Sequence, residues 1–105
     1  MAVHVHEKAA LKGESGLLIG PEQGATKGYC IGVAIYDQET YNTPGVHADQ
    51  EGFYCVSGRG MARVGNEEFE VSPGSAFIAL AGVPHSVKKL PGAEPVKLVW
   101  SHGAV

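Results

Sequence analysis

A histidine and a carboxylate, His47 and Glu51, stand four positions apart near the middle of the chain, and His85 ends a second stretch that begins at Gly82. Imidazoles and carboxylates bind transition metals and transfer protons in active sites. On one straight strand, however, the Cα atoms of His47 and Glu51 would lie about 13 Å apart. These two residues therefore act separately, or the chain folds back between them, where Asp49 is a turn-forming residue.

The elements that must position these residues are predicted to be short β-strands. The chain has 105 residues, 44% hydrophobic and 18% charged, so we expect one globular domain over residues 1–105. Fifteen glycines and six prolines indicate many short elements joined by tight turns, which is typical of all-β proteins. The expected strands are residues 1–6, 17–19, 29–36, the apolar run after Glu51, 61–64, 68–71, 75–80, 85–88 and 96–101.

Two local patterns refine this prediction. Gly65-Asn66 is a typical hairpin turn between the strands that flank it. In residues 29–36 the large side chains share one face, while the other face is small, which lets a second sheet or a ligand approach closely. The near-regular spacing of turns predicts a closed barrel or a double-sheet sandwich.

Several classes of protein are disfavoured by the composition. A net charge of −3 argues against a nucleic-acid surface or a polybasic membrane patch. No apolar run approaches the length of a membrane span, and the first residues do not resemble a signal peptide. Cys30 and Cys55 have neither a metal-binding spacing nor a disulfide framework, so a cytoplasmic location is predicted.

Two stretches resemble the two conserved motifs of the cupin family. The first motif, about residues 44–60, has a His-x-His pair followed by a glutamate and a glycine, and His47, Glu51 and Gly58 match its second histidine and the last two positions. Its first histidine falls on Gly45, which has no side chain.

The second motif, about residues 74–88, has a glycine, a Pro-x-Gly and a histidine. Gly74, Gly82 and His85 match it, while Leu80 stands where the proline is usual. The resemblance implies a double-stranded β-helix, or jelly-roll barrel, in which a turn swings His47 and Glu51 inward.

The resemblance also implies a divalent transition metal held by His47, Glu51 and His85. Iron, manganese, nickel and zinc all accept such ligands and are not distinguished, and the missing histidine at Gly45 implies weak binding. The alternative is a chain that has lost its metal, with the three residues as hydrogen-bonded polar groups inside the barrel.

Other residues are candidates for the vacant ligand position, although a water molecule is the simplest. Asp49 could reach inward, but an exposed turn residue is the preferred interpretation. His102 is in phase with inward-facing positions of the last strand, yet it lies near a terminus expected to fray. His4 and His6 are expected on the surface.

The remaining candidates have simpler interpretations. Cys55 and Phe53 are predicted to be core residues, and Arg59 a solvated surface residue. Five aromatic residues could line a pocket or belong to the core: Tyr29, Tyr36, Tyr41, Phe77 and Trp100.

Two functions follow from the resemblance. The first is a small metal-dependent enzyme, dioxygenase-like, that acts on a small organic molecule in the barrel, because iron needs few other groups for oxygen chemistry. The second is a non-catalytic small-ligand-binding or sensor domain. The resemblance also suggests a homodimer, and no residue identifies the substrate.

Overall fold

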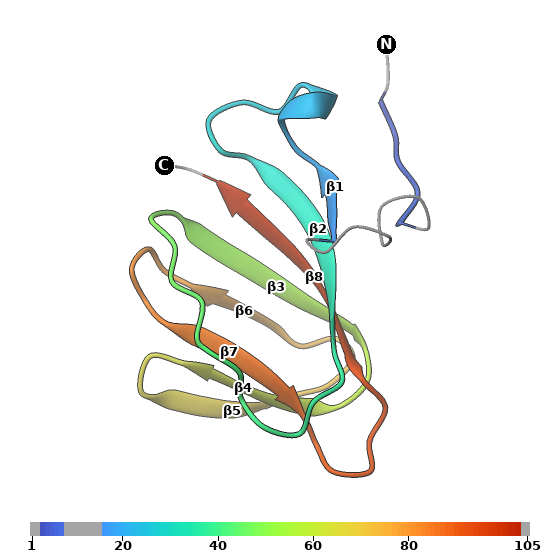
Figure 1. Ribbon diagram of the computed structural model, residues 1–105, viewed down its shortest axis with the longest axis vertical. Helices are drawn as coiled ribbons and strands as arrows, with labels where there is room; N and C mark the ends of the chain where they lie inside the picture. Colours follow the sequence, from blue (N-terminus) through green and yellow to red (C-terminus); the bar gives the residue numbers. More distant parts are fainter. Residues whose placement is uncertain (1–2, 8–15, 104–105) are drawn as a thin grey trace.

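The computed structural model describes residues 3–7 and 16–103, and in these residues the chain is almost entirely β-structure, as expected (Figure 1). A short 3-10 helix, η1 (Pro21–Gln23), follows the first strand. The strands in chain order are β1 (Leu17–Ile19), β2 (Cys30–Tyr36), β3 (Gln50–Ser57), β4 (Gly60–Val64), β5 (Glu67–Val71), β6 (Ala76–Ala79), β7 (His85–Lys89) and β8 (Val96–Gly103).

The strands form two antiparallel sheets. Five strands pair in the order β1-β2-β8-β3-β6, and three pair in the order β5-β4-β7. The chain crosses from one sheet to the other between β3 and β4, between β5 and β6, between β6 and β7 and between β7 and β8, so the last three strands alternate between the sheets. This double-sheet arrangement agrees with the predicted jelly roll.

The hairpin between β4 and β5 forms where Gly65-Asn66 predicts it. Val64 pairs with Glu67 across the turn, and Gly65 has a φ of 60°. Glycine enters this left-handed region without steric cost, which explains the choice of residue.

The hydrophobic core lies between the sheets, on the inward rows of β3 and β8. Phe53 pairs with Trp100 and Cys55 with Leu98, and Cys55 is fully buried, so both core predictions are confirmed. Glu51 pairs with His102 one step further along the same inward row. The core therefore ends at the polar residues of the site, and the packing of aromatic side chains fixes where those residues lie.

The small face of β2 points inward and admits an aromatic ring. Gly32 pairs with Trp100, and a Cβ at Gly32 would lie 2.2 Å from Cζ2 of that ring. The close approach predicted from the small residues is thus made by Trp100 of the neighbouring strand. On the opposite face of β2, Ile35 is exposed, whereas Val33 is buried.

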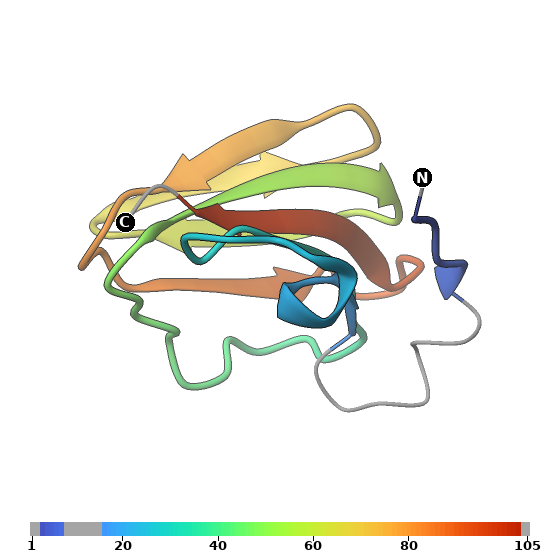
Figure 2. The same cartoon turned by 90° about the horizontal axis from the view of Figure 1, so that it is seen from above.

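The N-terminal segment differs from the sequence prediction. Residues 3–6 belong to no strand, so the edge strand expected over residues 1–6 is wrong for these positions, and residues 1–2 lie outside the described part. Figure 2 shows residues 3–7 beside the sheets rather than within one. The sequence also permits a helical turn over residues 7–11, but residues 8–11 lie outside the described part. Glu7 pairs with Lys97 of β8 at 2.7 Å.

Within residues 3–7 and 16–103, no helix is long and apolar enough to cross a membrane.

Candidate functional site

The chain folds back between His47 and Glu51, which brings their side chains together. Bends at Ala48 and Asp49 precede the start of β3, and the Gly82 amide donates to the His47 carbonyl oxygen at 2.8 Å. As a result, His47 Nε2 lies 3.3 Å from Glu51 Oε1. The turn at Asp49 therefore brings together two residues that a straight strand would keep apart.

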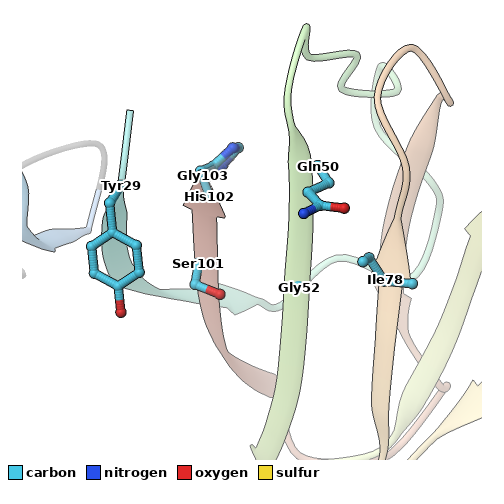
Figure 3. A pocket seen from close by; sticks show the side chains of 7 residues that line it. All are labelled: Tyr29, Gln50, Gly52, Ile78, Ser101, His102 and Gly103. Carbon is cyan, nitrogen blue, oxygen red and sulfur yellow. The ribbon is translucent and has the colours of Figure 1, made fainter. Parts of the chain in front are cut away.

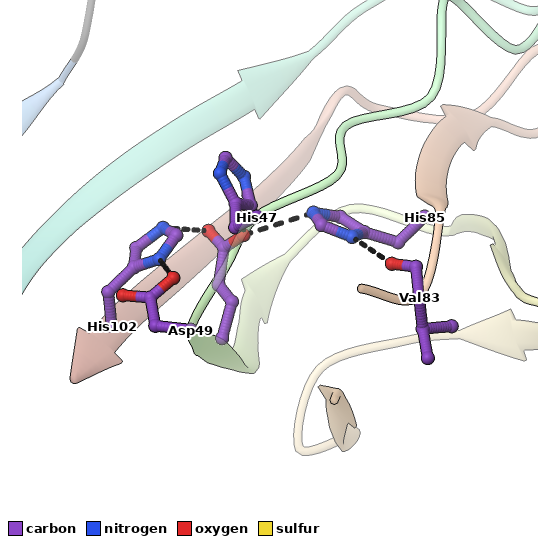
Figure 4. A network of polar contacts seen from close by, with 6 residues as sticks. His47, Asp49, Val83, His85 and His102 are labelled. Carbon is purple, nitrogen blue, oxygen red and sulfur yellow. Dashed lines mark hydrogen bonds and ion pairs between the residues drawn. The ribbon is translucent and has the colours of Figure 1, made fainter. Parts of the chain in front are cut away.

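His85 reaches the same carboxylate from the opposite sheet, as the first residue of β7. It forms a backbone bridge with Gly45, in which each amide donates to the other's carbonyl oxygen at 2.8 and 3.0 Å. His85 Nε2 lies 3.0 Å from Glu51 Oε1 (Figure 4). On the other side of the ring, Nδ1 donates to the Val83 carbonyl oxygen at 3.2 Å. This bond orients the imidazole with Nε2 toward the carboxylate.

Glu51 is the centre of this cluster and is only 6% exposed. Its Oε1 atom is fully buried and accepts no well-aligned hydrogen bond from the residues that the structure describes. The Glu51 carboxylate raises the pKa of His85, against burial, which lowers it. A buried acceptor faced by two imidazole nitrogens is the arrangement that a cation satisfies.

The residues present therefore fit a divalent metal. One ligand atom each of His47, Glu51 and His85 lies within 4.8 Å of the other two. Two histidines and one carboxylate are a ligand set of both iron and zinc sites that keep open positions for water or substrate.

Gly45 borders the cluster at the position where the family motif has its first histidine. A Cβ at this residue would lie 3.3 Å from His85 Nε2 and 3.6 Å from His47 Nε2. The absence of a side chain leaves room directly beside both nitrogens. This room is continuous with a cavity of about 220 Å³ that opens between the sheets, lined by Tyr36, Asn42, Thr43, Gly45, His47, Glu51, Phe53, His85, Ser86 and Val87.

His102 and Asp49 complete the polar network on the side of β8. His102 Nε2 lies 2.9 Å from Glu51 Oε2, and His102 Nδ1 donates to Asp49 Oδ1 at 3.1 Å (Figure 4). The inward orientation expected for His102 is confirmed, whereas the preferred interpretation of Asp49 as an exposed turn residue is wrong. Its side chain is 15% exposed, and the bond from His102 lowers its pKa.

The other candidates lie away from the cluster. His4 and His6 are exposed in the segment beside the sheets, as expected. Arg59 is on the surface, where it pairs with Glu70 at 2.8 Å. Cys30 and Cys55 are free thiols.

Two loop residues that line the cavity were not foreseen. Asn42 and Thr43 lie in the segment between β2 and β3, which the sequence predicted only as a loop. No periodic pattern marks which loop residues turn toward a cavity, so the sequence holds no signal for them. Tyr36 was foreseen as one of several pocket candidates, and burial, followed by the Glu51 charge, raises its pKa.

A second hollow of about 280 Å³ lies on the outer side of the five-stranded sheet (Figure 3). Its lining includes Gln50 and Gly52, which flank Glu51 on β3 and so point to the opposite face. Tyr29, Ile78, Ser101, His102 and Gly103 complete the lining (Figure 3). None of the residues that line the His47–Glu51–His85 cavity lines this hollow, whereas His102 of the polar network does.

Comparison with known proteins gives a family and a set of structural relatives. A family model for the cupin domain matches residues 32–102. The polyketide cyclase RemF from Streptomyces resistomycificus is 20% identical, with 98% of this chain and 80% of that chain covered and a TM-score of 0.77. TT1209 from Thermus thermophilus is 25% identical, with 77% of this chain and 78% of that chain covered and a TM-score of 0.64.

A structure described as that of the DMSP lyases RdDddP and RnDddQII is also 25% identical, with a TM-score of 0.63. It is covered over 75% of this chain but only 40% of that chain, so most of that protein has no counterpart here. No curated protein sequence matches the chain.

Proposed function

We propose that this chain, which belongs to the cupin family, is a metal-dependent enzyme that acts on a small organic molecule in the cavity beside Gly45. The observation that carries the proposal is the approach of His47 and His85 to one buried oxygen of Glu51 that accepts no aligned hydrogen bond from the described residues. When bound, a divalent metal would supply Lewis acidity or, if it is iron, oxygen activation.

The residues around the cluster support binding of a small molecule. Gly45 leaves space at the two imidazole nitrogens, so a ligand can reach them from the cavity. Phe53 and Val87 form an apolar wall, and Asn42 and Thr43 add polar groups. Most of the lining residues are polar, so the cavity suits a small polar molecule.

A dioxygenase-like reaction is the first candidate, because oxygen chemistry needs few groups besides the metal ligands. Tyr36 favours a second candidate, a non-redox lyase or cyclase reaction. Its phenol lines the cavity and carries a hydroxyl hydrogen that it can donate to a bound molecule. The likeness to a polyketide cyclase and to DMSP lyases agrees with this candidate.

Metal content and oxygen uptake test the proposal. The purified protein is expected to contain a transition metal in near-stoichiometric amount by plasma mass spectrometry. After loading with Fe(II), oxygen uptake is measured against a panel of diketones, thiols and catechols.

The variant Gly45→Ala tests whether the space beside Gly45 is needed. Its methyl group would lie beside Nε2 of His47 and of His85, so turnover is expected to fall at least about tenfold while metal is retained.

The outcomes separate the alternatives. Uptake with one substrate class supports the dioxygenase. A flat oxygen panel, with product formed from the same compounds under nitrogen, supports the lyase or cyclase reaction. Binding without turnover favours a ligand-binding or sensor domain, and absence of metal from protein grown in metal-supplemented medium overturns the proposal.

A homodimer is also proposed, through the outer face of the five-stranded sheet. Ile35, Tyr54 and Ile78 are 55%, 51% and 49% exposed there, which is a large apolar area for an isolated surface. A second copy that presents the same face would bury these side chains. Light scattering is expected to give twice the mass of one chain, and a monomeric mass would contradict this assignment.

The free thiols agree with the predicted cytoplasmic location.

A further inference from the structure

His102 stands beside the candidate metal site but belongs to neither family motif. It lies on β8, where it pairs with Glu51 of β3, so its side chain enters the cluster from a third direction. The rings of His47 and His102 meet edge to face with centroids 4.7 Å apart, and His102 is mostly buried. His47, Asp49 and His102 form a second group whose ligand atoms lie within 4.8 Å of one another, and this group shares only His47 with the first.

The hydrogen bonds of the imidazoles define where their protons are. A carbonyl oxygen and a carboxylate oxygen can only accept, so His85 Nδ1 and His102 Nδ1 must each carry a hydrogen. In the neutral tautomer, Nε2 of each ring therefore has no hydrogen and carries a lone pair. Both lone pairs then face the Glu51 carboxylate, at 3.0 Å from Oε1 and 2.9 Å from Oε2.

At these distances, the nitrogen lone pairs and the carboxylate oxygens repel one another unless a cation lies between them. The cation is either a proton on each ring, which gives imidazolium groups, or one metal ion that the nitrogens and the carboxylate share. The bond from His102 Nδ1 to Asp49 is the carboxylate–histidine pair that commonly supports a metal-binding imidazole. His102 is thus oriented in the same way as His85.

We propose that His102 is the third histidine ligand of the metal and takes the place of the histidine that Gly45 lacks, with Asp49 as the residue that positions it. The donor set then consists of His47, Glu51, His85 and His102, so the number of imidazoles in the family's site is restored from a different strand. Because His85 and His102 approach different oxygens of Glu51, these side chains draw closer together when the metal binds. The inference rests on the proposed function, because it concerns the same metal.

Nitrogen NMR of the zinc-loaded protein tests this assignment residue by residue. Zinc binding shifts the resonance of the ring nitrogen that coordinates it, so the Nε2 signals of His47, His85 and His102 are expected to move together on zinc addition. In His102→Ala the zinc Kd is expected to increase about 10- to 100-fold. His4→Ala, which removes an exposed histidine outside the sheets, is expected to leave the Kd unchanged.

The variant Asp49→Asn distinguishes the proposed metal ligand, His102, from the residue that positions it, Asp49. It is expected to weaken zinc binding less than His102→Ala, because the ligand nitrogen is retained while its orientation is loosened. A Kd that is raised in His102→Ala while the wild-type Nε2 signal of His102 does not move on zinc addition would overturn the assignment and leave His102 a residue that positions Glu51. If the signals of His47 and His85 do not move either, the proposed metal site itself is wrong.

Discussion

In the variant Glu51→Gln, metal binding is expected to be lost. The substitution keeps the size of the side chain but removes the charge on which His47 and His85 converge. Loss of residues that merely support metal ligands costs 10- to 100-fold in affinity, so loss of this carboxylate is expected to raise the metal Kd more than about a hundredfold. Plasma mass spectrometry of the purified variant should then find little or no bound metal.

Thermal unfolding gives an independent measurement of the same effect. A ligand present at 100 times its Kd stabilises the folded state by about 2.7 kcal/mol, which for a chain of this size raises Tm on the order of 10 °C. Wild-type protein is expected to show this increase with zinc, and Glu51→Gln is expected to show none.

Glu67→Gln is the matched control, since it removes an exposed carboxylate from the β4–β5 hairpin. It is expected to keep both the bound metal and the increase in Tm. Equal increases in Tm for Glu51→Gln and the wild type would show that the metal binds elsewhere.

Much of the fold could be predicted because its signals are local. Turn residues recur between short strands, and the hairpin at Gly65 and the small face of β2 are visible as patterns of a few residues. The turn at Asp49 and the two motifs were also sufficient to bring His47, Glu51 and His85 to one place, as found.

The Asp49–His102 pair could not be predicted in the same way, because it depends on strand register. His102 meets Glu51 only because β8 pairs with β3 in one alignment, and a shift of one residue would turn His102 to the outer face. Period-two alternation in β2 likewise shows which residues share a face but not which face is buried. Trp100 determines this, since its ring needs the small side at Gly32.

The pH dependence of stability is expected to have opposite signs in the metal-free and the zinc-loaded protein. Without metal, the Glu51 carboxylate raises the pKa of His85 above its ordinary value. Folding then favours protonated His85, so its contribution is complete below the pKa of the unfolded chain, about 6.5, and is lost as the pH rises through the raised pKa.

Zinc reverses this trend because it needs the Nε2 lone pair of His85, for which protons compete. Its affinity therefore rises with pH over the same window, by up to about tenfold, or 1.4 kcal/mol, per pH unit for each proton displaced. Urea unfolding from about pH 6 to 8, with a chelator or with excess zinc, should give free energies of unfolding that diverge as the pH increases. His85→Ala should remove this divergence, whereas parallel curves in the wild type would mean that His85 does not bind the metal.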